Sequence, residues 1–105
     1  MRKIRILLDY RCYPIWVFNE KGELMCNDLP DELRNDVDVQ KNLEDIQRIY
    51  ESLFIDNAIE FRYKGFDSEV KKSEFLSKLS RVMQLIELKV GNIYKIENRV
   101  NLNEF

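Results

Sequence analysis

Two apolar stripes with helical spacing constrain the fold of this chain more than any other feature of its sequence. The first stripe recurs at intervals of four, three, four and three residues and consists of Val39, Leu43, Ile46, Tyr50 and Leu53. The second stripe follows the same period and consists of Phe75, Leu79, Val82, Ile86 and Val90. Because this spacing places the apolar side chains on one side of a helix, each stripe predicts an amphipathic helix that packs on a core.

The segments before the first stripe have the pattern that is typical of strands. Residues 3–10 alternate between two faces and predict a half-buried strand. Residues 13–18 are apolar on both faces and predict a central strand, with Pro14 near its start because proline cannot donate to a ladder. A short loop that contains Gly22 then leads to residues 23–26, so these two segments predict a β-hairpin.

Two more segments of the chain also predict strands. Residues 59–63 alternate apolar and charged side chains, which predicts a third, half-buried strand. Residues 92–96 predict a final short strand after Gly91, which we expect to occupy the C′ position of the last helix. Val100 and Leu102 continue the alternation, so the tail either extends the sheet or frays.

Residues that are frequent at helix ends predict where each helix begins and ends. A short helix should begin at Asp28 and end near Arg34, because acidic residues suit the positive end of the helix dipole. We expect Asp38 to cap the first long helix and Asp56 to end it. Either Asp67 or Ser68 should open the last helix.

The order of these elements predicts an α+β fold. Strands and helices do not alternate regularly, and the opening hairpin is antiparallel. We therefore expect a mostly antiparallel sheet, made of the N-terminal hairpin and two or three further short strands, packed against two main α-helices. With 105 residues, the chain has the length of a single globular domain spanning residues 1–105.

The residue types of the chain argue against catalysis. It contains no histidine, which excludes imidazole bases and histidine metal ligands, and none of the common phosphate-binding or nucleophile motifs is present. Asp36, Asp38 and Gln40 have a spacing found in calcium loops, but the glycine and glutamate that complete such a loop are missing. The sequence therefore predicts a non-catalytic protein without a cofactor or a metal site.

The first residues and the lack of a long apolar stretch predict a cytoplasmic protein. Asp9 and Arg11 interrupt the early apolar run, and no small-residue cleavage site of a signal peptide follows. No apolar stretch is long enough to span a membrane. Cys12 and Cys26 should be free, half-buried thiols, and a disulfide would require the strands that carry them to lie side by side.

Charge is distributed unevenly along the chain. Residues 28–60 carry ten acidic and three basic side chains, a net charge of −7, although the whole chain has a net charge of −2. Residues 28–38, here called the acidic segment, concentrate this charge. They form either a solvated face or a surface for a basic partner. In the second case the binding residues would be Asp31, Glu32, Asp36 and Asp38.

Aromatic side chains lie just before the acidic segment. Tyr10, Tyr13, Trp16 and Phe18 could belong to the core, contact a protein or stack on bases. Tyrosine and tryptophan are frequent anchors of protein interfaces, so Tyr13 and Trp16 are candidate partner-binding residues. The negative net charge and the mixed charges of the last helix argue against nucleic-acid binding.

Two short stretches, Arg11-Cys12-Tyr13-Pro14-Ile15-Trp16 and Asn27-Asp28-Leu29-Pro30, carry a resemblance to a known family. Through them, residues 4–33 resemble a family of small cytoplasmic immunity proteins from the polymorphic toxin systems of Gram-positive bacteria. The resemblance implies that the chain neutralises a cognate toxin domain by direct binding. Two alternatives remain open from the residues: a structural or regulatory interaction domain, such as a homodimer or a phage accessory protein, and a nucleic-acid-associated regulator. The sequence does not set the oligomeric state.

Overall fold

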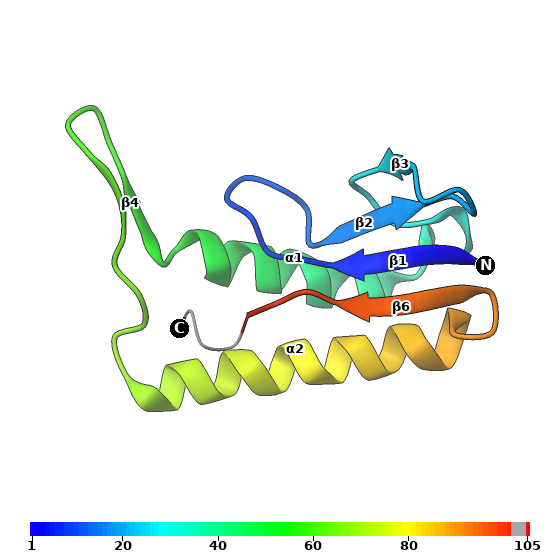
Figure 1. Cartoon of the computed structure of the whole chain (residues 1–105). Coiled ribbons are helices and arrows are strands. Elements are labelled where there is room, and N and C mark those ends of the chain that lie inside the picture. The colour runs from blue at the N-terminus through cyan, green and yellow to red at the C-terminus, as the bar shows by residue number, and fades with distance from the viewer. Residues whose placement is uncertain (102–104) are drawn as a thin grey trace.

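A computed structural model describes residues 1–101 and 105 and confirms the α+β class. It contains two long helices, one short 3-10 helix and six strands (Figure 1). In chain order the elements are β1 (Arg2–Ile6), β2 (Ile15–Phe18), β3 (Leu24–Cys26), η1 (Asp31–Leu33), α1 (Val37–Glu51), β4 (Phe54–Asp56), β5 (Phe61–Tyr63), α2 (Glu69–Val90) and β6 (Tyr94–Asn98). That residues 1–105 act as a single domain stays a prediction.

The main sheet has four strands in the order β3-β2-β1-β6. The pairs β1–β2 and β2–β3 are antiparallel, and the predicted hairpin at Gly22 is present between β2 and β3, where Gly22 has a φ of 82°. β6 pairs with β1 in parallel, because α2 crosses back along the sheet before β6 begins. The sheet is therefore mostly antiparallel with one parallel pair, and β6 forms one of its edges.

The second predicted stripe faces the core in full, as do Val39, Leu43 and Ile46 of the first, whereas Leu53 lies beyond the end of α1. One cluster of buried residues joins the stripes of α1 and α2 to the inner face of the sheet, which is formed by Ile4, Ile6, Ile15 and Val17. Lys3, Arg5 and Trp16 alternate with these residues and lie on the outer face, where they stay partly exposed. The two helices thus cover one face of the sheet and leave the other open.

Several predicted boundaries are wrong, and local hydrogen bonds explain why. Asp36, not Asp38, caps α1, since its side chain accepts a hydrogen bond from the Val39 amide at 3.1 Å. The short helix is a single 3-10 turn that begins after Pro30, whereas Asp28 lies outside it and accepts from the Leu29 amide.

The ends of the first strand and of the last helix also differ from expectation. β1 stops at Ile6, because after one further hydrogen bond, from Leu7 to Pro14, the chain turns through Arg11. Ser68 caps α2 as expected. Gly91 is the C-cap residue with a right-handed φ of −64°, and a side chain there would collide with the carbonyl oxygen of Glu87.

The predicted third strand exists, but it belongs to a second sheet. α1 ends at Glu51 and not at Asp56, so residues 54–56 become β4 and pair with β5. Every residue of β5 is exposed, in contrast to the predicted half-buried strand. The β4–β5 hairpin projects from one end of the molecule (Figure 1). In the tail, Val100 is half-buried, and Leu102 lies outside the described residues.

Candidate partner-binding site

Four aromatic rings at the β4–β5 hairpin form what we call the aromatic cluster: Tyr10, Phe54, Phe61 and Tyr63. The ring centroid of Tyr10 lies 4.9 Å from those of both Phe54 and Phe61, whose own centroids are 5.5 Å apart. Tyr63 meets Phe54 edge-on at 5.3 Å. A two-stranded hairpin is marginally stable alone in water, so the ring of Tyr10, from the β1–β2 loop, stabilises it.

Asp56 connects the same loop to the hairpin through polar contacts. Its carboxylate accepts a hydrogen bond from the Tyr10 hydroxyl at 3.0 Å and pairs with the Arg11 guanidinium at 2.9 Å. Arg11 has a φ of 58°, a left-handed conformation that costs a residue other than glycine roughly 1–2 kcal/mol. The contacts with Asp56 connect the loop to the hairpin, although the Arg11 side chain is 74% exposed and its ion pair offsets only part of this cost.

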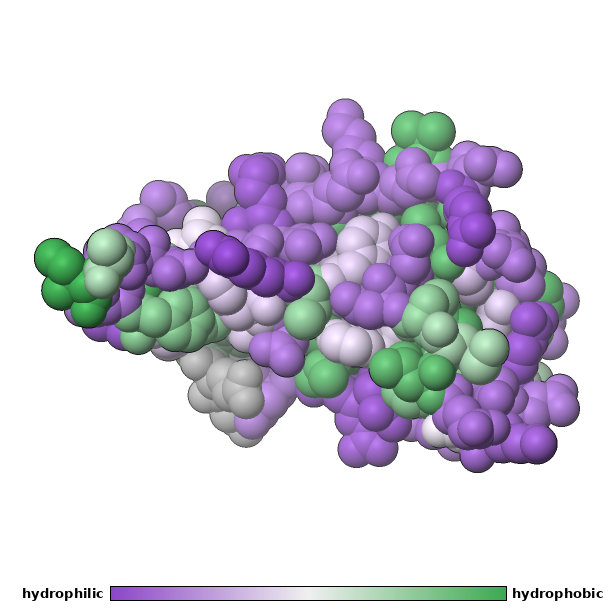
Figure 2. All heavy atoms as spheres, turned by 90° about the horizontal axis from the view of Figure 1, so that it is seen from above, coloured by the Kyte–Doolittle hydropathy of each residue, from purple (hydrophilic) through white to green (hydrophobic). Residues whose placement is uncertain are grey.

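The outer side of the hairpin exposes large apolar side chains. Ile59 is 95% exposed, Phe61 is 56% exposed and Tyr63 is 41% exposed. The apolar atoms at this end stand out in Figure 2, which views the molecule from above. Exposed apolar groups that cluster on a projecting element are typical of interaction sites.

In the acidic segment, the protein uses Glu32 internally. The Tyr94 hydroxyl donates to the Glu32 carboxylate at 2.8 Å, and Arg2 pairs with it at 3.4 Å. These contacts lower the pKa of Glu32, and the hydrogen bond from Tyr94 is the largest cause. Burial, together with the bond to Glu32, raises the pKa of Tyr94 to about 12. Glu32 therefore holds η1 against the start of β6.

Asp36 is also engaged within the protein. Besides capping α1, its carboxylate pairs with the Lys89 ammonium near the end of α2. The pKa of Asp36 is lowered first by the hydrogen bond from Lys89 and then by that from the Val39 amide. Asp36 thus ties the beginning of one long helix to the end of the other, a role that the sequence pattern did not predict.

Asp31 and Asp38 remain accessible. The Asp31 side chain is 87% exposed, although Arg34 approaches it at 3.2 Å. Asp38 is exposed in the first turn of α1, and its carboxylate forms no ion pair with any described residue. Of the four predicted acidic residues, these two present their charge outward.

The two aromatic candidates have different surroundings. Tyr13 is half-buried, and burial followed by the charges of Asp28 and Glu44 raises its pKa to about 12. Trp16 lies on the outer face of the sheet opposite Arg5, where its indole N–H donates to the Leu7 carbonyl at 3.1 Å. Trp16 thus lies on the outer sheet face, whereas Tyr13 is within reach of the charge of Asp28 in the acidic segment. That the six predicted residues form one binding surface stays a prediction.

A charged group on the outer sheet face was missed by sequence reasoning. Glu97 of β6 pairs with Lys3 at 3.1 Å, Arg5 at 2.8 Å and Arg99 at 2.6 Å. Hydrogen bonds, first from Arg99 and then from Lys3, lower the pKa of Glu97 to about 2. The alternation along residues 3–10 indicated an outer face, but only the parallel pairing of β6 with β1 places Glu97 between these cations.

A comparison with known protein families assigns the chain to one of them. A family model described as Serratia CdiI immunity protein-like matches residues 2–99. The chain belongs to this family. The match spans every helix and strand described above, so the hairpin, the acidic segment and the outer sheet face all lie within the family region. No curated protein matches the chain.

Membership of the CdiI immunity protein-like family confirms the coarser part of the resemblance seen in residues 4–33, an immunity protein, and places it in a contact-dependent inhibition system. The Gram-positive source that the resemblance implies stays a prediction. Cys12 and Cys26 are free and half-buried, as expected. Within the described part of the chain, no helix combines the length and the apolar character that are needed to cross a membrane.

Proposed function

We propose that this chain neutralises one cognate toxin domain in the cytoplasm by binding it directly, without chemistry of its own. Family membership supports the immunity role. The single observation that carries the binding mode is the β4–β5 hairpin, whose apolar side chains project into solvent although the core of the protein is complete without them. An immunity protein needs a surface that a partner can cover, and this hairpin provides one.

Energetics favour the hairpin as the apolar part of the interface. Full burial of an isoleucine or phenylalanine side chain contributes about 1.5–3 kcal/mol, and Ile59 and Phe61 still have most of that area exposed. The aromatic cluster and the Asp56 contacts hold the hairpin in place before binding. Little conformational entropy is then lost when a partner docks, which improves affinity.

We further propose that the acidic segment, at the opposite end of the molecule from the hairpin, provides a separate polar contact for a toxin with a basic surface. Asp31 and Asp38 would contribute directly, since they are exposed. Glu32 and Asp36 would act mainly by holding η1 and α1 in position. Tyr13 and Trp16 stay candidate contacts at the margins of this surface.

The test uses the toxin domain encoded beside the gene for this chain. The wild-type protein should bind this domain and restore growth to cells that express it. Ile59→Asp should weaken binding about a hundredfold, because it removes an apolar contact and buries a charge. Val70→Asp is the matched control, since Val70 is 66% exposed on α2. Failure of the wild type to bind or protect would refute the proposed function, and equal affinities for both variants would exclude the hairpin.

A further inference from the structure

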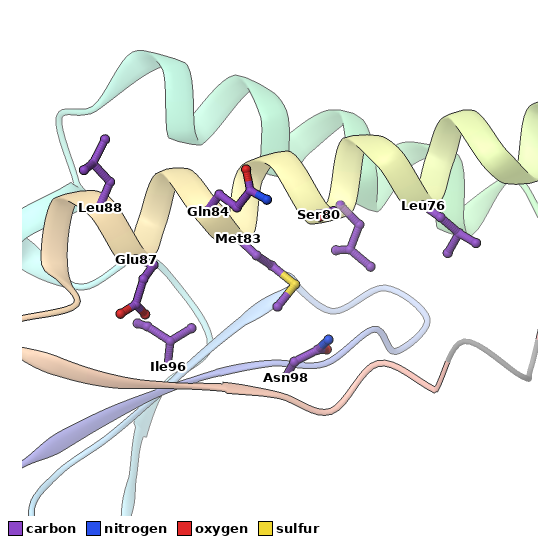
Figure 3. A pocket seen from close by; sticks show the side chains of 9 residues that line it. Leu76, Ser80, Met83, Gln84, Glu87, Leu88, Ile96 and Asn98 are labelled. Atoms are coloured by element: carbon purple, nitrogen blue, oxygen red, sulfur yellow. The ribbon is translucent and has the colours of Figure 1, made fainter.

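A groove between α2 and β6 lies apart from both the hairpin and the acidic segment. It has a volume of about 650 Å³. Its apolar lining comes from Leu76, Met83 and Leu88 of α2 and Ile96 of β6 (Figure 3). Leu88 is 82% exposed, so part of the apolar lining is not covered by the core.

The strand beside this groove has a free backbone edge. β6 pairs with β1 on one side, and no strand of the described chain pairs with its other side. The Arg99 amide donates to the Ile6 carbonyl, so the odd-numbered residues of β6 direct their backbone groups toward β1. Because neighbouring residues of a strand point their N–H and C=O groups in opposite directions, Ile96 and Asn98 direct theirs outward. An exposed edge of this kind is a template for another strand.

The charge of the groove restricts which chain can occupy it. Glu87 is the charged residue among those that line the groove, and its carboxylate makes no ion pair with a described residue. A second copy of this chain would bring a second Glu87 and no lysine or arginine from this lining. An occupant with a basic side chain would instead neutralise the carboxylate.

We infer that an extended segment of the toxin domain pairs with β6 as a fifth strand of the main sheet. Its inward side chains are apolar and fill the space between Leu76, Met83 and Leu88, and a lysine or arginine at one end pairs with Glu87. The free edge selects an extended backbone over a helix, since main-chain hydrogen bonds provide the affinity in strand addition. This inference rests on the proposed function and adds a second contact surface to it.

The first experiment measures affinity for the neighbouring toxin domain with two matched variants of the full chain. Ser80 lines the groove, and Ser77 is exposed on the same helix outside it. Ser80→Trp should fill the groove and weaken binding at least about tenfold, because interface energy concentrates in well-packed pockets. Ser77→Trp should bind like the wild type. Circular dichroism of both variants checks that they are folded.

The second experiment reads the edge directly by amide hydrogen exchange. The amides of Ile96 and Asn98 should exchange quickly in the free protein and at least about tenfold more slowly in the toxin complex. If the wild type binds the toxin without this protection, or if both tryptophan variants bind equally well, the inferred strand pairing at the groove is refuted. The proposed function would not be affected by either result. If the wild type does not bind the toxin domain, both the strand pairing and the proposed function are refuted. Protection in the free protein that rises with its concentration would assign the edge to a second copy instead.

Discussion

The β4–β5 hairpin and the acidic segment lie at opposite ends of the molecule and differ in how far the protein satisfies their side chains (Figure 1). At the hairpin, Ile59 and Phe61 remain mostly exposed after folding. In the acidic segment, Glu32 and Asp36 are already bound to Tyr94 and Lys89. Most of the apolar surface of Ile59 and Phe61 is thus available to a partner, whereas Glu32 and Asp36 already use their charge within the protein.

This difference has a physical cause. An acidic side chain can be satisfied by cations, hydroxyls or free amides of its own chain, and this fold provides all three. An exposed apolar side chain is removed from water only by the core or by another molecule. Charge counted along a sequence therefore overstates the charge that a partner meets, while an apolar group left outside a complete core is a more direct sign of binding.

The largest expected effect concerns the core on which both regions rest. Leu79 is 2% exposed on the apolar stripe of α2, so Leu79→Ala should lower the free energy of unfolding by about 2–5 kcal/mol. Leu88→Ala on the same helix is the control, and it should cost less than about 0.5 kcal/mol because Leu88 is exposed. Chemical denaturation measures both. Similar losses for the two variants would mean that the buried face of α2 is wrongly assigned.

A smaller effect separates the two kinds of acid in the acidic segment. Asp36→Ala removes the cap of α1 and the partner of Lys89, and it should cost about 1 kcal/mol of unfolding free energy. Asp38→Ala, two residues along, should change stability by less than about 0.5 kcal/mol. If thermal denaturation shows equal stability for the two variants, Asp36 is as available to a partner as Asp38, and the contrast between the two regions fails.

Much of the fold could be predicted from the periodicity of the sequence, because the packing of the two apolar helix stripes on the sheet determines the arrangement of the core. Residues such as Leu43 and Ile86 are buried as their spacing predicts. The parallel pairing of β6 and the second sheet could not be predicted, since both depend on where the chain goes between elements. The end of α1 at Glu51 frees residues 54–56 for β4, and no residue in that stretch marks the change clearly.

The candidate site was less predictable than the fold. Residue type and charge pointed to Asp31 and Asp38, which are exposed, but also to Trp16, whose indole N–H is already bound to the Leu7 carbonyl. Binding surfaces depend on contacts between distant residues, such as Tyr10 with Asp56 or Glu32 with Tyr94. A sequence shows the members of such pairs without showing that they meet.

On the outer face of the sheet, the carboxylate of Glu97 has three cationic partners and is satisfied within the protein, like Glu32 and Asp36. The pKa of Glu97 falls from 4.5 to about 2, so its ion pairs stabilise the folded protein fully above pH 4.5. This stabilisation is lost as the pH falls through the folded value. Wild type should therefore be more stable than Glu97→Gln at pH 6, and the difference should shrink progressively toward pH 2. Denaturation midpoints over this range measure it, and a constant difference would contradict the assigned charge role.

The smallest effect tests whether the accessible acids steer a toxin. The double variant Asp31→Lys with Asp38→Lys should reduce the association rate severalfold at low salt, because both side chains are exposed and face a basic partner in the proposed complex. The effect should fade near physiological salt, where charges are screened beyond about 8 Å. The dissociation rate should change little, because exposed pairs contribute little once a complex has formed.

The control for this experiment reverses charges of the same sign away from the acidic segment. Glu69→Lys and Glu74→Lys lie on exposed positions of α2 and change the net charge by the same amount. If steering depends on the location of Asp31 and Asp38, the control pair should slow association less than the test pair, as stopped-flow measurements at several salt concentrations would show. Equal slowing by the two pairs would mean that only the net charge matters. The acidic segment would then be a solvated face, and of the two regions only the hairpin would remain a binding element.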